Sequence, residues 1–314
     1  MNNLITNKKG AFEVSFAWVF AIVIGAFILF LAIFAAVKLI GLGEEESSAK
    51  TSKEIGILLN PLETGFESAR SASFNMPVDT RIYGSCDLDG NFGKQLISVS
   101  QKSFNKWTET DLEVQFLNKY IFNTEFVEGR KFYVFSKPFE FPFKVGDLIY
   151  LSSSKDEYCL LDAPDEIGRE IENLNQPNLV LGNCSENAIR VCFSGGVECN
   201  VEVDYVSKAV RKSSGIMYFE NDALMYAAIF SDKEIYECQL QRLMKRISEL
   251  ATIYENKIII TSREGCDSNL AQDLAALKIM VKNVESSGNL GKKLNAIVEG
   301  IIEDNKYSSE CKLW

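Results

Sequence analysis

The cysteines are the residues of this sequence with the clearest chemistry. Their number is eight, and the chain contains no histidine. Cysteine thiols form disulfides in an oxidising compartment, and thiolates at close spacing bind zinc. Zinc is the weaker interpretation because no two cysteines form a C-x-x-C pair, and Cys184, Cys192 and Cys199 are spaced too widely for a zinc knuckle. We therefore expect the even set of cysteines to form disulfides: Cys86, Cys159, Cys184, Cys192, Cys199, Cys238, Cys266 and Cys311.

The lack of histidine argues against an enzyme. It removes the usual general base, the usual partner of a nucleophilic Ser or Cys, and the commonest metal ligand. Phosphate-binding glycine loops of the Walker or dinucleotide type are also missing from the sequence. We predict no catalytic, cofactor or metal site. The alternative that stays open is an exported hydrolase or transferase that uses carboxylates, since 43 acidic residues form many pairs.

One segment has the length and composition of a membrane span. Val14 to Val37 are 24 consecutive residues without a charge, which is about 36 Å of helix against a hydrocarbon core of roughly 30 Å. Secretory signal peptides have apolar cores of only about 7 to 15 residues, so we expect a retained anchor in the lipid bilayer. Lys8 and Lys9 precede the span and three glutamates follow it, which predicts a cytoplasmic N-terminus and an extracellular remainder.

The part after the span is acidic. The chain has 33 basic and 43 acidic residues, and three of the lysines and one glutamate lie before residue 44, which leaves 30 against 42. A surface of that sign repels phosphate backbones, so nucleic acid is not an expected partner.

The pattern along the chain predicts an α+β protein in five parts. These are a cytoplasmic basic segment (1–10), a transmembrane helix (11–42), a helical stalk (43–73), an antiparallel β-rich extracytoplasmic domain (74–219) and a C-terminal three-helix bundle (220–314). Pro61 should kink or divide the stalk. Alternating apolar positions, such as Leu112, Val114 and Phe116 or Phe132 and Val134, indicate strands in the fourth part.

Within the β-rich part, Asp165 to Leu174 has the pattern of a short helix. Pro138 and Pro142 suggest an edge or a loop rather than a central strand.

A hairpin is expected around Ser194-Gly195-Gly196. A two-residue turn would bring Cys192 opposite Cys199, but a three-residue loop places Ile189, Val191 and Phe193 on one face with Val197, Cys199 and Val201, and leaves Cys192 on the other. Because burial of one consistent face should decide the register, we predict that Cys192 and Cys199 are not bonded.

Helical periodicity begins after Phe219. Ser231 and Glu234 have the spacing of a capping box, and an apolar stripe follows at steps of three and four: Tyr236, Leu240, Leu243, Ile247, Leu250 and Tyr254. If three helices run antiparallel, the start of the second and the end of the third lie at one end, which predicts a Cys266–Cys311 bond. Ile258 to Thr261 could instead be extended.

Lys8-Lys9-Gly10 directly before the apolar helix resembles the class III signal of archaeal type IV pilins and pilin-like proteins. The resemblance covers about residues 7–42. It implies cleavage by a prepilin peptidase between Gly10 and Ala11, and assembly through the exposed helix, in which Glu13 is the candidate for the family's acidic residue. A plain acidic residue at the headgroup layer is the alternative for Glu13. Ala17, Ala21 and Gly25 form a small-residue stripe that permits close helix approach in lipid.

These features predict a membrane-anchored structural or interaction protein at the cell surface. A protein partner or self-association through the anchor or head is expected. The sequon Asn183-Cys184-Ser185 permits N-glycosylation.

Overall fold

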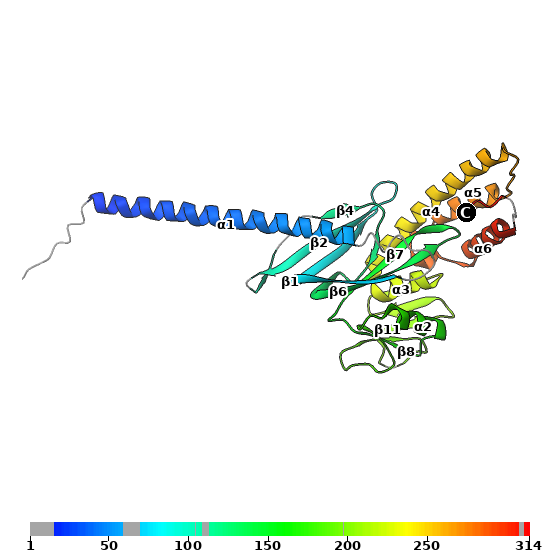
Figure 1. Ribbon diagram of the computed structural model, residues 1–314, viewed down its shortest axis with the longest axis horizontal. Helices are drawn as coiled ribbons and strands as arrows, with labels where there is room; N and C mark the ends of the chain where they lie inside the picture. Colours follow the sequence, from blue (N-terminus) through cyan, green and yellow to red (C-terminus); the bar gives the residue numbers. More distant parts are fainter. Residues whose placement is uncertain (1–15, 59–69, 104, 109–112, 197, 308–310) are drawn as a thin grey trace, which may run out of the picture. The chain divides into compact units, whose positions relative to one another are not determined.

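The computed structural model describes residues 16–58, 70–103, 105–108, 113–196, 198–307 and 311–314 (Figure 1). The chain divides into two compact units, Met1–Ser47 and Ser48–Trp314. The protein is a mixed α+β structure, as the sequence predicts. Strands and helices of the second unit share one large apolar core, which contains Tyr150 and Val203 from strands and Leu243 and Ile301 from helices.

Helix α1 (Phe16–Leu58) contains the apolar segment. The part of this helix from Trp18 to Ala36 has a mean hydropathy of 3.0 and is 0% buried. By its length and composition, this part could cross a membrane. The helix ends at Leu58, and Ile55 near this end is 1% exposed in the core of the first sheet. The predicted stalk was too long, because residues 70–73 belong to a strand. Pro61 lies outside the described residues.

The first sheet is built mainly from long antiparallel strands. In spatial order its path is β3 (Lys106–Trp107), β2 (Lys94–Ser103), β1 (Arg70–Asp87), β6 (Phe126–Glu140), β7 (Lys144–Ser153) and β5 (Tyr120–Phe122), with β4 (Val114–Phe116) paired to β2. Strand β5 is parallel to β7. Alternate residues such as Ile97 and Val99 are buried, which is the period-two pattern of a strand with one core face.

Pro138 lies within β6, in the part of the strand beyond its described pairing with β1, which fits the predicted edge position. It pairs with Asp147 of β7, whereas the described pairing of β6 with β1 ends at Ser136. The missing N–H of Pro138 is therefore tolerated where the strand has a partner on one side. Pro142 follows in the turn to β7, after a cis peptide bond with Phe141.

The second sheet is mixed, which corrects the expectation of an antiparallel head. Its order is β13 (Gly215–Tyr218), β12 (Ala209–Lys212), β11 (Val201–Asp204), β10 (Ile189–Cys192), β8 (Tyr158–Leu161) and β9 (Leu179–Leu181). Strands β9, β8, β10 and β11 are parallel, and β12 and β13 are antiparallel additions. Parallel neighbours need a crossover, and α2 (Asp165–Leu174) supplies it between β8 and β9. The helix has the predicted bounds.

The predicted hairpin around Gly195 is wrong. Strands β10 and β11 run parallel, with Val191 beside Val201, so the connection between them is a loop that turns back rather than a tight turn. Cys192 at the end of β10 is bonded to Cys199 in this loop, with Cα atoms 5.9 Å apart. The argument from a shared hairpin face failed because the two strands do not form a hairpin.

The remaining helices follow the second sheet. Helix α3 (Asp222–Phe230) is buried on every side from Ala223 to Phe230. Helices α4 (Lys233–Ser262), α5 (Ala271–Lys282) and α6 (Lys292–Tyr307) come next, with a short 3-10 turn, η2 (Ser287–Asn289), before α6. The stripe residues Tyr236, Leu240, Leu243 and Ile247 are each 0% exposed, as predicted.

The predicted capping box is wrong, and the alternative left open for residues 258–261 does not occur. Ser231 ends α3, where its backbone N–H donates to Ala227, and the N-cap of α4 is Asp232. The carboxylate of Asp232 accepts the N–H of Glu125 at 2.7 Å instead of capping the helix. Residues 258–261 are helical rather than extended.

All eight cysteines are paired. The Cys266–Cys311 bond confirms the prediction. The other two bonds join Cys86 to Cys238 and Cys159 to Cys184, and the first of these ties α4 to β1 across 152 residues of sequence.

A chain of buried polar side chains attaches α4 to the first sheet. Gln95, Gln239 and Arg242 are each 0% exposed. The Gln95 amide donates to the carbonyl of Ser85 and accepts the N–H of Ile121, each at 3.0 Å, and thereby bridges β1, β2 and β5. Gln239 donates to Gln95 Oε1 at 2.5 Å and accepts from Arg242 at 2.7 Å.

The Arg242 guanidinium completes this chain, which we call the α4 seam (Gln95, Gln239 and Arg242). It donates to the carbonyls of Phe92, Leu117 and Lys119 at 3.2, 3.0 and 2.8 Å. It also lies 4.7 Å from the ring centroid of Tyr120. Burial lowers the pKa of Arg242 to about 10, so the group is still charged at neutral pH.

Replacing Gln239 with leucine should destabilise the fold. The change leaves Gln95 Oε1 with one donor fewer and Arg242 with one acceptor fewer, at a cost of roughly 1–3 kcal/mol for buried polar groups left unpaired. Urea unfolding of Gln239→Leu should therefore show a lower midpoint. The exposed Gln272 of α5 provides the matched control, Gln272→Leu. Equal midpoints for the two variants would contradict the role of the seam.

Lys212 predicts a pH dependence of stability. Its Nζ donates to the carbonyl oxygens of Ile229 and Ser231 at the end of α3, and burial lowers its pKa to about 8. The unfolded chain, with a pKa near 10.4 for lysine, binds more protons than the folded one between these values, so the free energy of unfolding should rise with pH. We expect the free energy of unfolding of the wild-type protein, measured by denaturant titration, to rise by about 1–2 kcal/mol relative to that of Lys212→Met between pH 8 and 9.5. A difference between the two proteins that stays constant with pH would show that the group does not titrate there.

Candidate functional site

The carboxyl ends of the parallel strands meet at one edge of the second sheet. After β8 the chain passes through α2 to β9 on one side, and after β10 it passes to β11 on the other. Strands β8 and β10 are neighbours, with Leu161 beside Cys192. Connections that leave adjacent strands in opposite directions form a topological switch point, which is where open parallel sheets hold their ligands.

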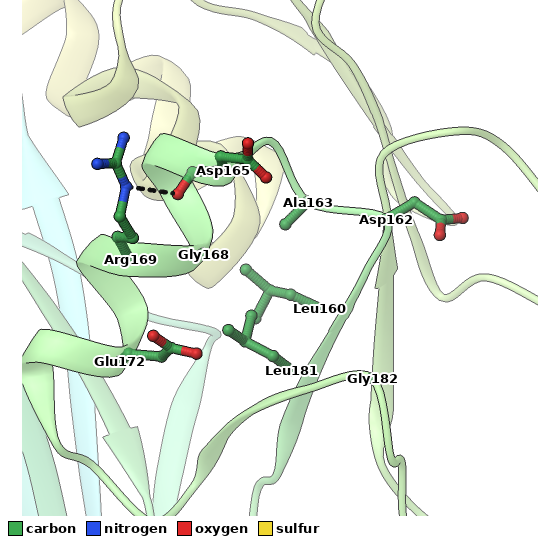
Figure 2. Close-up of a pocket in the computed structure, with 9 residues that line it drawn as sticks. All are labelled: Leu160, Asp162, Ala163, Asp165, Gly168, Arg169, Glu172, Leu181 and Gly182. Carbon is green, nitrogen blue, oxygen red and sulfur yellow. Dashed lines mark hydrogen bonds between the residues drawn. The ribbon is translucent and has the colours of Figure 1, made fainter.

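A groove lies beside this switch point, between α2 and the ends of β8 and β9. Its volume is about 730 Å³, and we call it the strand-end groove. Figure 2 shows Leu160 and Leu181 between Glu172 of α2 on one side and Asp162 on the other. The other residues that line the groove are Ala163, Asp165, Gly168, Arg169 and Gly182.

Each charged side chain is positioned by a separate local feature. Asp162 follows β8 directly and has a φ of 53°, and its carboxylate accepts a hydrogen bond from the hydroxyl of Ser194. Asp165 is in the first turn of α2, and Glu172 lies two turns further. The Nε of Arg169 donates to the carbonyl of Asp165 at 3.2 Å, as the dashed line in Figure 2 marks.

A second cavity adjoins the groove and shares Asp162 with it. Its volume is about 410 Å³. It is lined by the half-cystines Cys184, Cys192 and Cys199, and by Arg190 and Glu198, which form an ion pair. We call it the disulfide cavity. The two cavities together cover the ends of β8 and β10.

A cluster behind α2 holds this helix against the first sheet. Lys137 Nζ of β6 lies 2.7 and 2.6 Å from the two carboxylate oxygens of Glu170, and 3.8 Å from Asp222. Tyr226 donates its hydroxyl to Glu170 at 3.0 Å. Burial, followed by the charge of Glu170, raises the pKa of Tyr226, so this phenol stays a donor. Because Glu170 is on α2, the cluster fixes the helix that forms one wall of the groove.

The charges that line the groove indicate which kind of ligand it favours. Asp156, whose pKa is raised by burial, lies outside the residues that line either cavity. Among the described residues there is no group of three or more His, Cys, Asp or Glu residues that could hold a metal ion. With three carboxylates and one guanidinium, the groove favours a ligand of net positive charge.

The residues singled out in the sequence do not converge on this groove. Gly10, Ala11 and Glu13 lie outside the described residues. Ala17 is in α1, where Ala21 and Gly25 are exposed. Asn183 is exposed in the turn after β9, next to Gly182 of the groove.

Sequence reasoning missed Asp162, Asp165 and Glu172. Their only local signal is an acidic residue directly after a strand and others within the following helix. That signal indicates a site only when β8 is known to belong to a parallel sheet, and the sequence analysis predicted an antiparallel one.

Comparisons of this chain with protein-family models, with curated proteins and with solved structures give no match. Any function must therefore be argued from the chain itself.

Proposed function

We propose that the protein is a membrane-anchored, extracytoplasmic structural or interaction subunit of the pilin-like kind. The observation that carries the proposal is the exposed apolar part of α1, Trp18–Ala36, which is 0% buried. Exposed apolar surface of this extent needs lipid or another protein around it.

The cysteines support an oxidising location. All eight are paired, and disulfides persist on the outer side of the membrane and are rare in the cytoplasm. In the proposed orientation Lys8 and Lys9 stay inside and the acidic remainder lies outside. The resemblance of Lys8-Lys9-Gly10 to a class III signal then supports cleavage after Gly10.

The head in this proposal presents a surface for a protein partner. It includes α4, α5 and α6 as an antiparallel three-helix bundle, which is supported by the packing of α5 against both neighbours and by the Cys266–Cys311 bond. The excess of acidic residues suits a partner with basic groups.

The assembly role is tested in α1. Ala21 and Gly25 are exposed on the small-residue stripe, and close approach of helices in lipid requires small side chains. We expect Gly25→Leu to reduce crosslinked oligomers of the full-length protein in mild detergent several-fold. Val23→Leu, at a position that is 60% exposed and off the stripe, is the control and should not change them.

A wild-type protein that stays monomeric in mild detergent, together with membranes that yield no crosslinked partner, would remove the support for an assembly role. N-terminal sequencing of the native protein tests the processing step separately. A mature chain beginning at Ala11 is the expected result, and an intact N-terminus would exclude prepilin-type processing.

A further inference from the structure

We propose that the Cys192–Cys199 disulfide is a thiol-exchange site, at which a dithiol-bearing protein or peptide attacks Sγ of Cys199. The bond lies in the disulfide cavity, at the carboxyl ends of β8 and β10. This reactivity is independent of assembly through α1.

The first argument is the length of chain that each bond closes. Cys192 and Cys199 are 7 residues apart, whereas the partners in the other three bonds are 25, 45 and 152 residues apart. The stabilisation gained from a disulfide grows with the length of the loop it closes. Opening the Cys192–Cys199 bond therefore removes the least constraint from the unfolded chain.

This bond is also unnecessary for pairing the strands beside it. The N–H of Asn200 donates to the carbonyl of Arg190 at 3.0 Å, and Asn200 Oδ1 accepts the N–H of Arg190 at 2.8 Å. Together with the pairing of β10 and β11, these bonds hold the loop ends after reduction.

The second argument is access to one sulfur. Cys199 is half-buried, whereas Cys192 is 4% exposed. Position 196 is glycine, and a Cβ there would lie 3.2 Å from Sγ of Cys199. The missing side chain leaves one side of this sulfur uncovered. The other bonds also contain a half-buried sulfur, such as Cys184 beside the buried Cys159, so the side left uncovered by Gly196, rather than exposure alone, distinguishes Cys199.

The third argument is the charge around the sulfurs. Arg190 lines the same cavity, and a guanidinium beside a cysteine favours the thiolate, which is the leaving group of exchange. Its partner Glu198 has a side chain that is 79% exposed, so the ion pair is open to solvent and weakly held.

The exchange proceeds in two balanced steps. A thiolate of the partner attacks Sγ of Cys199, forming a mixed disulfide while the bond to Cys192 breaks and Cys192 leaves as a thiolate. The second thiolate of the partner then attacks its own mixed-disulfide sulfur and displaces the Cys199 thiolate. The partner dithiol is oxidised by two electrons, and Cys192 and Cys199 are reduced and take up two protons.

The test is to treat the full-length protein in detergent with dithiothreitol at limiting concentration, trap thiols by alkylation, and locate them by peptide mass mapping. We expect Cys192 and Cys199 to be alkylated together before any other cysteine. Gly196→Ala should slow this reaction roughly fivefold, because its methyl group covers Sγ of Cys199.

Gly168→Ala is the matched control. Gly168 lies in α2, where a Cβ meets only Leu181 at an ordinary 3.7 Å, so this variant should react at the wild-type rate. Earlier opening of any other disulfide would overturn the proposal. Reaction of Gly196→Ala at the wild-type rate would overturn the assignment of Cys199 as the attacked sulfur.

Discussion

The second unit depends on a positive charge buried between α4 and the first sheet. A guanidinium that is 0% exposed must find acceptors for its N–H groups or the fold loses several kcal/mol. The acceptors of Arg242 include the carbonyls of Phe92, Leu117 and Lys119, which come from the turn before β2 and the connection between β4 and β5. These carbonyls point at Arg242 only when both segments are folded. The positions of α4, of the turn before β2 and of the β4–β5 connection therefore depend on one another.

The same seam brings distant parts of the first sheet together. Strands β6 and β7 separate β1 from β5 in the ladder, yet Gln95 bonds to both Ser85 and Ile121. Asn123 lies against Gly84, where a Cβ would be 2.2 Å from its Oδ1, so only glycine fits there. The Cys86–Cys238 bond links α4 to β1 beside the α4 seam, since Cys86 pairs with Gln95 and Cys238 precedes Gln239. Covalent and polar links thus act on a single contact between α4 and the sheet.

The two sheets have different roles in this arrangement. The first carries the seam and receives the end of α1 through Ile55. The second presents its strand ends, where parallel pairing creates the groove and the neighbouring disulfide cavity. Helix α3 lies in the core that joins them, and the Lys137–Glu170 pair connects β6 to α2. Helix α2, which forms one wall of the groove, is therefore held by the first sheet, although it connects two strands of the second.

Local patterns decided the features that sequence analysis predicted correctly. The apolar run of α1, the helix at Asp165–Leu174 and the buried stripe on α4 each depend on periodicity within one segment. The Cys266–Cys311 pairing followed from helix order alone. Strand direction, by contrast, depends on which segments meet in space. The sequence around Gly195 fits a hairpin as well as a returning loop, so only the pairing of β10 with β8 and of β11 with β10 decided how Cys192 meets Cys199.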